Sequence, residues 1–224
     1  MSKFSYSQVT CPKCNKIQKV KVWDSINVNL DAEQKENIMS GKLFQFICDE
    51  CGFTTRVEYP CLYHDMDKNL MIYCIPNFSG YTKILDKMLN KLKLDSPENS
   101  MENYEFRVVK DTNKLAEKIK IFDEELDDRV IEIIKIINRS FFLKKYPEKE
   151  IEEILFNKNS EGSYVAQFLI KDGTVAFMPI SEEMIDVILE KHKELLKEEK
   201  KEKGFVLIDE VWAYNKIMNE KKHA

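Results

Sequence analysis

Two Cys-x-x-Cys pairs near the N-terminus are the residues most able to do chemistry. Cys11 and Cys14 form the first pair, in CPKC, and Cys48 and Cys51 form the second, in CDEC. A turn of this kind directs two sulfurs at one ion, and four thiolates make a closed tetrahedral Zn²⁺ site. The segment 15–47 between the pairs exceeds the usual ribbon spacing. The chain must therefore loop out and return to complete such a site.

The residue after each pair favours a metal over thiol chemistry. Asn15 follows the first pair and Gly52 the second, and both residue types tolerate the left-handed backbone of a metal-binding turn. A redox pair would instead begin a helix, whose dipole lowers the pKa of a thiol. Strand-like sequence follows both pairs. We predict one structural Zn²⁺ on the four cysteines, with a thiol redox protein as the alternative.

A second group of candidate residues lies in CLYHDMDKNLMIYCIP (61–76), which predicts a hairpin with DMDKN as its turn. This hairpin would place Cys61 opposite Cys74. Both can be small buried apolar residues, or Cys61 and His64 can form a secondary metal site through their C-x-x-H spacing. His64 beside Asp65 could also serve a hydrolase as an acid–base pair, although adjacent strand residues point to opposite faces.

Two further groups of polar residues have ordinary structural explanations. The acidic segment 123–128 could bind a divalent cation, but its position before a helix favours a capping turn. His192 and His223 lie in segments rich in Lys and Glu, and we expect both to face solvent.

A third group could form a contact surface. The chain carries a net charge of −4, but residues 1–23 contain five lysines and no acid. The candidate contact residues are Lys13, Lys19, Lys21 and Trp23, with Phe4 nearby. Lysines and aromatic rings of this kind can bind nucleic acid, or the lysines can protect an edge strand from aggregation. The negative net charge does not favour a general nucleic-acid binder.

The residue pattern along the first half predicts a β-rich module. It predicts strands at 16–23, 42–48 and 53–60, helices at 31–41 and 79–93, and a polar linker at 94–103. We therefore place a zinc-ribbon-like module at 1–94.

The second half predicts helices packed on an antiparallel sheet. A strand at 104–110 precedes helices at 112–126 and 127–146. A meander over 152–180 turns at Asp172-Gly173, and Ser181 caps a long helix over 181–203. Residues 103–224 would form an α+β companion domain, so the predicted fold class of the whole chain is α+β.

Composition sets the expected location of the chain. No stretch of the 224 residues approaches 18 consecutive apolar residues, so we expect no transmembrane helix and no membrane partner. The N-terminal segment lacks the apolar core of a signal peptide. We therefore expect a cytoplasmic protein, whose thiols remain reduced.

Several quoted segments together resemble one family. The pair CPKC and CDEC, the segment VWDSINVNLD, the hairpin EYPCLYHDMDKNLMIY and the block FRVVKDTNKLAEKIKIFDEELDDRVIEIIK are similar to the CpXC family of prokaryotic proteins, over roughly residues 8–135. The resemblance implies a zinc-ribbon-like domain. It brings no established reaction and no catalytic residues.

These observations favour a zinc-stabilised binding or adaptor protein that recognises a protein partner. A closed four-cysteine shell leaves no coordination position for a substrate, so we expect the metal to fold the module rather than to catalyse. The alternative function is a nucleic-acid-binding zinc-ribbon protein. A thiol redox protein or a hydrolase using His64 and Asp65 comes after both.

Overall fold

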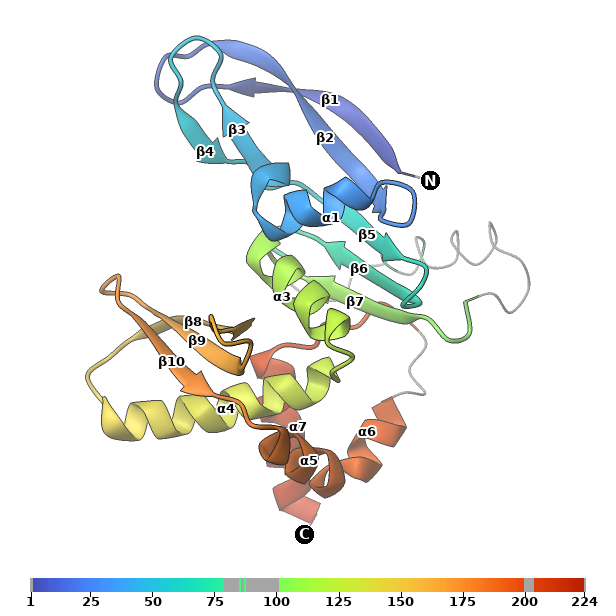
Figure 1. Ribbon diagram of the computed structural model, residues 1–224, viewed down its shortest axis with the longest axis vertical. Coiled ribbons are helices and arrows are strands. Elements are labelled where there is room, and N and C mark those ends of the chain that lie inside the picture. The colour runs from blue at the N-terminus through green and yellow to red at the C-terminus, as the bar shows by residue number, and fades with distance from the viewer. Residues whose placement is uncertain (1, 79–84, 86, 88–100, 200–203, 224) are drawn as a thin grey trace. The chain divides into compact units, whose positions relative to one another are not determined.

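The computed structural model describes residues 2–78, 85, 87, 101–199 and 204–223 (Figure 1). The chain divides into two compact units, which are described separately. Unit 1 comprises Met1–Ala116 with Gly204–Val206, and unit 2 comprises Glu117–Lys203 with Leu207–Ala224. None of the described helices is both long and apolar enough to span a bilayer. The mixed content of helices and sheets confirms the predicted α+β class.

Unit 1 is built on a five-stranded sheet whose order is β1-β2-β5-β6-β7. Its strands are β1 (Lys3–Thr10), β2 (Ile17–Asn27), β5 (Cys61–Asp65), β6 (Leu70–Cys74) and β7 (Glu105–Val109). Neighbours β1–β2 and β5–β6 are antiparallel, whereas β2–β5 and β6–β7 are parallel. Between β2 and β5 come α1 (Ala32–Met39), the 3₁₀ turn η1 (Lys42–Phe44), and a small hairpin of β3 (Gln45–Ile47) with β4 (Thr54–Arg56).

The β7 edge of this sheet is covered by a segment from far along the chain. The N–H of Val108 donates to the carbonyl of Val206 at 2.9 Å, and the N–H of Val206 donates to the carbonyl of Phe106 at 3.3 Å. Phe205 packs with Phe106 and Leu62 on one face of the sheet. Residues 204–206 therefore belong to unit 1, although most of unit 2 precedes them.

Unit 2 places helices on a three-stranded antiparallel sheet, as predicted (Figure 1). Its elements are the end of α3 (Thr112–Asp123), α4 (Asp128–Lys145), β8 (Ile151–Lys158), β9 (Tyr164–Ile170), β10 (Val175–Pro179), α5 (Glu182–Lys191), α6 (Lys193–Glu199) and α7 (Glu210–His223). One core joins α4, the inner face of the sheet and α5. In it the rings of Phe142 and Phe168 stack with centroids 4.7 Å apart.

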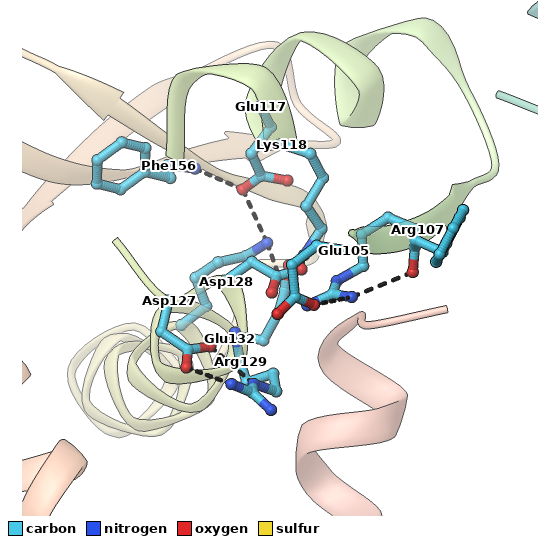
Figure 2. Close-up of polar contacts among 11 residues, drawn as sticks. Glu105, Arg107, Glu117, Lys118, Asp127, Asp128, Arg129, Glu132 and Phe156 are labelled. Atoms are coloured by element: carbon cyan, nitrogen blue, oxygen red, sulfur yellow. Dashed lines mark hydrogen bonds and ion pairs between the residues drawn. The ribbon is translucent and has the colours of Figure 1, made fainter. Parts of the chain in front are cut away.

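A chain of buried charges runs between α3, α4 and β8 in unit 2 (Figure 2). Glu117 accepts a hydrogen bond from the N–H of Phe156 at 2.6 Å and pairs with Lys135 at 2.9 Å. Lys135 also pairs with Glu132 at 2.9 Å, which pairs with Lys118 at 3.0 Å. The last ion pair of the series joins Lys118 to Asp128, also at 3.0 Å. These five side chains are at most 2% exposed, so their charges are compensated by one another rather than by water.

The structure corrects several predicted elements. The helix predicted over 181–203 is broken at His192, whose φ of −108° and ψ of 21° leave the helical region. His192 is 4% exposed, so the prediction that it faces solvent is wrong. The break lets Ile188 before it and Leu196 after it both reach the core. The side chain of His223 and most of the helix predicted over 79–93 lie outside the described residues.

Two more differences concern unit 1. The predicted strand 42–48 begins as the turn η1, and β1 was not predicted at all. Unit 1 extends to Ala116, past the linker predicted over 94–103, because β7 pairs with β6 along its whole length. Residues 94–100 of that linker lie outside the described residues.

The predicted helix cap at Ser181 is present and gives a first test. The Ser181 hydroxyl accepts a hydrogen bond from the N–H of Met184 at 3.1 Å. We expect Ser181→Ala to lower the free energy of unfolding by about 1 kcal/mol, because the N–H groups of the first turn lose their acceptor. Urea denaturation measures this change. Ser181→Asp is the control that should keep the stability, since Asp is an equally good cap.

Candidate metal centre

The four predicted cysteines meet at one point. The Sγ atoms of Cys11 and Cys51 are 3.7 Å apart, and those of Cys14 and Cys48 are 3.5 Å apart. All four sulfurs lie within 4.8 Å of one another, and all four cysteines are free thiols. A tetrahedral ion with metal–sulfur bonds of about 2.3 Å places its sulfurs roughly 3.8 Å apart. The cluster therefore has the donor set and spacing to hold a metal ion.

The two cysteine turns share one backbone geometry. The N–H of Asn15 donates to the carbonyl of Cys11 at 2.9 Å, and that of Gly52 donates to Cys48 at 3.0 Å. Asn15 has a φ of 59° and Gly52 a φ of 66°, so both adopt the predicted left-handed conformation. Neither turn begins a helix, and the redox alternative therefore lacks the helix dipole that would activate a thiol.

The two turns are joined through the β1–β2 and β3–β4 hairpins. The first turn connects β1 to β2, and the second connects β3 to β4. Gln18 on β2 links them: its side chain donates to the carbonyl of Ile47 at 2.9 Å and accepts from the N–H of Asp49 at 3.0 Å. Cys11 and Cys48 are buried with Phe46 in a small apolar cluster. This cluster is small, so a bound ion would supply much of the cohesion of the two hairpins.

The thiols influence one another's protonation. Desolvation raises the pKa of Cys11, but hydrogen bonds from the backbone N–H groups of Cys14 and Lys13 outweigh it and lower the pKa to about 7. The N–H of Lys16 lowers the pKa of Cys14, but desolvation and the neighbouring sulfurs raise it to about 12. The N–H of Phe53 lowers the pKa of Cys51, but desolvation and the sulfurs of Cys48 and Cys11 outweigh it, so the pKa is raised. One thiolate disfavours the next in such a cluster, and a bound cation reverses this effect.

The left-handed turn at Gly52 gives a second test. A side chain at Gly52 would meet no atom within 4 Å, so its cost is that of the backbone conformation alone. We expect Gly52→Val to weaken metal affinity by about tenfold, because a branched side chain costs about 1–2 kcal/mol in this region. Competition with a chromogenic chelator measures the affinity. Gly52→Asn should change it less, as Asn15 already occupies the equivalent position in the first turn.

The proposed secondary site is not assembled. Cys61 and Cys74 are directly opposite each other, as predicted, and both are fully buried. Burial, as the largest cause, raises the pKa of Cys61 to about 12 and raises that of Cys74 as well. Among the described residues, the four-cysteine cluster is the one group of three or more His, Cys, Asp or Glu side chains close enough together to hold a metal ion.

His64 and Asp65 have separate partners. The Nε2 atom of His64 is 2.9 Å from the hydroxyl of Tyr104. Asp65 accepts from the hydroxyl of Tyr63 at 3.2 Å and lies 3.7 Å from the ammonium of Lys35. Burial is the largest cause of the lowered pKa of His64. Because His64 and Asp65 are neighbours on β5, they point to opposite faces, and the acid–base pair of a hydrolase is not formed.

The predicted contact residues lie along the β1–β2 hairpin and in the cysteine turn that joins its strands. Tyr6 pairs with Lys21, and Phe4 with Trp23, across the two strands. The Lys21 ammonium lies 4.0 Å from the ring centres of both Phe4 and Trp23. Trp23 is 8% exposed, whereas Phe4 is 49% and Tyr6 65% exposed. The exposed rings thus come from β1, a strand that the sequence did not predict, while Lys13 lies in the first cysteine turn and Lys19 next to Lys21 on β2.

The comparisons with known proteins agree with the resemblance found in the sequence. The model of the family described as "CpXC protein" matches residues 9–135, which is more than half of the chain. Comparisons with curated proteins and with solved structures found no match. The matched range contains both cysteine turns, the β5–β6 hairpin, and the part of α3 and α4 that carries the buried charges. With its four sulfurs assembled inside the matched range, the chain belongs to the CpXC family.

Proposed function

We propose that this chain is a zinc-stabilised binding module that recognises a protein partner. The observation that carries the proposal is the closed cluster of four sulfurs within 4.8 Å. Thiolates are the ligands that Zn²⁺ favours in structural sites. All four positions of a tetrahedral ion are taken by Cys11, Cys14, Cys48 and Cys51. No position is left for a substrate, and the ion acts on the fold rather than on a reaction.

Recognition of a protein accords better with the exposed side chains than recognition of nucleic acid. Sequence-tolerant binding of single strands needs flat aromatic surfaces on which bases stack. Here Lys21 covers Trp23, and the rings of Phe4 and Tyr6 stand at 89° to each other. The side chains available on β1 and β2 thus favour side-chain and backbone contacts with another polypeptide.

Metal content and partner capture test the two halves of the proposal. Protein purified without added metal or chelator should contain one zinc per chain. The zinc-loaded chain, immobilised and exposed to a lysate of the cells that produce it naturally, should retain a partner protein. That partner should also bind the chain when each protein has been purified separately. Cys48→Ser should lose both the zinc and the partner, whereas Cys61→Ala should keep both, because Cys61 lies outside the cluster.

Other outcomes would redirect the proposal. A reversible disulfide within either cysteine pair, with no bound metal, would make a thiol redox function the better hypothesis. Zinc in the cluster together with salt-sensitive binding of DNA or RNA, and no purified protein partner, would favour a nucleic-acid-binding ribbon.

A further inference from the structure

We propose that strand β1 takes up an extended acidic segment of the partner as an added strand of the unit 1 sheet. The inference rests on the proposed function, since it names the part of the chain that binds and the chemistry of the segment bound. Addition of a strand to an open sheet edge is a common mode of peptide recognition, in which backbone hydrogen bonds supply affinity and alternate side chains supply specificity.

The outer edges of β7, β8 and β10 are protected. Residues 204–206 cover β7 through the hydrogen bonds of Val206. On β8, the outward N–H of Phe156 is bound by the buried carboxylate of Glu117 at 2.6 Å. Strand β10 is only five residues long and ends at Pro179, which has no N–H to offer. Short strands, proline and covering segments are the usual means by which proteins close an edge.

Within the described residues, β1 is neither short nor covered and contains no proline, and its lysine and its register shift are confined to its start at Lys3 and Phe4. It has eight residues without proline, seven of them exposed, and a paired strand on one side only. In a strand, alternate backbone N–H and C=O groups point away from the neighbouring strand. Those of Lys3–Thr10 that point away from β2 therefore form a ready template for a further strand about eight residues long.

Charge defines the segment that fits beside β1. Residues 1–23 carry five lysines and no acid. Lys3 begins β1, Lys19 and Lys21 lie on β2, and Lys13 lies just beyond the far end of β1. The fifth, Lys16, is partly offset by Glu50 at 4.0 Å. An acidic segment complements this charge.

The two faces of β1 further define the side chains of the segment. Phe4 and Tyr6 share one face with Lys19 and Lys21, because Tyr6 pairs with Lys21 and Gln8 with Lys19, so acidic side chains of an added strand fit on this face. Ser5 and Ser7 point to the other face, where uncharged side chains such as threonine and tyrosine fit. The same charge disfavours a second copy of this chain, because self-pairing would bring two basic hairpins together.

The test uses the zinc-loaded full chain and a fluorescein-labelled ten-residue peptide in which glutamate alternates with threonine and tyrosine. Fluorescence anisotropy measures its binding. Amide hydrogen exchange followed by NMR locates it. At ten times the Kd we expect exchange to slow about tenfold at alternate residues of Lys3–Thr10 and to stay unchanged in β6. A peptide with lysine in place of glutamate, and an acidic peptide with two central prolines, should not bind.

Matched variants separate strand addition from general attraction. Lys19→Glu should weaken binding of the acidic peptide by roughly threefold, the size of one exposed charge pair. Lys144→Glu makes the same change of charge on α4 and should leave binding unaltered. Absence of peptide binding, or binding without protection of β1, would overturn the inference. A purified partner that binds elsewhere on the chain would leave the proposed function intact in that event.

Two other results would also overturn it. The first is slow exchange of the β1 amides at high protein concentration without peptide, together with a dimer in sedimentation. That result would mean that the edge of β1 pairs with a second copy of this chain. Binding of a fluorescein-labelled oligothymidine that is weakened by Lys19→Glu, with no binding of the acidic peptide, would assign it to nucleic acid.

Discussion

Cys48→Ser is expected to release the metal and to unfold the β3–β4 hairpin together with both cysteine turns. A structural zinc ion contributes about 10–16 kcal/mol to the folding of a small zinc-binding peptide, which matches or exceeds the whole stability of a typical domain. Without the ion, the apolar cluster around Cys11, Phe46 and Cys48 is small. Elemental analysis measures the zinc, and hydrogen exchange of residues 9–20 and 44–57 measures the local unfolding.

Cys61→Ala is the control for this experiment. Cys61 is a buried cysteine of the same unit, but it lies on β5 and takes no part in the cluster. Its replacement should keep one zinc per chain and the protection of both turns. A Cys48→Ser protein that still holds zinc at full stoichiometry, with unchanged exchange, would refute the assignment of these four ligands.

Lys135→Met is expected to lower the free energy of unfolding by about 3–5 kcal/mol. Lys135 is 0% exposed and pairs with both Glu117 and Glu132. Its removal leaves two carboxylates buried and short of a counter-charge, and that penalty is the largest part of the cost of breaking a buried ion pair. The remaining Lys118 still contacts Glu132 and Asp128. Burial lowers the pKa of Lys118, but Asp128, Glu132 and Glu117 together outweigh it and raise the pKa. Lys118 therefore stays charged but cannot replace the lost contact to Glu117.

Lys149→Met is the matched control on the surface of the same unit. Lys149 pairs with Asp172 at 2.6 Å, but the two side chains are 34% and 45% exposed. Water compensates their charges when the pair is broken, so we expect a loss of less than about 1 kcal/mol. Urea denaturation compares the two variants. If both variants lost the same free energy of unfolding, burial would not be the reason for the large effect expected at Lys135.

Local sequence predicted the cysteine turns because their geometry depends on adjacent residues. The left-handed positions of Asn15 and Gly52 follow from residue type alone. The register of the β5–β6 hairpin followed in the same way from its short turn, and it placed Cys61 opposite Cys74. The cap at Ser181 and the turn at Asp172-Gly173 are equally local. Each of these features was correctly predicted without knowledge of any distant contact.

The features that were missed depend on partners far along the chain. Glu117, Lys118 and Lys135 are ordinary surface residues by type, and only their mutual contacts allow them to be buried. The predicted capping turn is present, since Asp127 accepts from the N–H of Arg129 at 3.0 Å and Asp128 lies in the first turn of α4. What was missed is that Asp128 is also the buried end of the chain of charges. His192 was misjudged for the same reason, since its neighbours in sequence are mostly charged.

Strand β1 was missed because its sequence gives a weak signal. In KFSYSQVT the alternation of aromatic and small polar residues that indicates a strand covers only Phe4–Ser7 and is broken at Gln8. Its place in the sheet depends on pairing with β2 through the first cysteine turn. The strand that carries the proposed binding edge is thus defined by the metal turn beside it rather than by its own side chains.

The cover of the β7 edge has a consequence for synthesis of the protein. Strands β6 and β7 leave the ribosome long before Val206, and nearly all of unit 2 is made in between. During that interval the sheet of unit 1 has an open edge at β7, and the ring of Phe106 lacks its contact with Phe205. The first unit to begin folding is therefore completed only after most of the second has been made. Nascent chains that stall before residue 204 should be especially prone to pair with one another through β7.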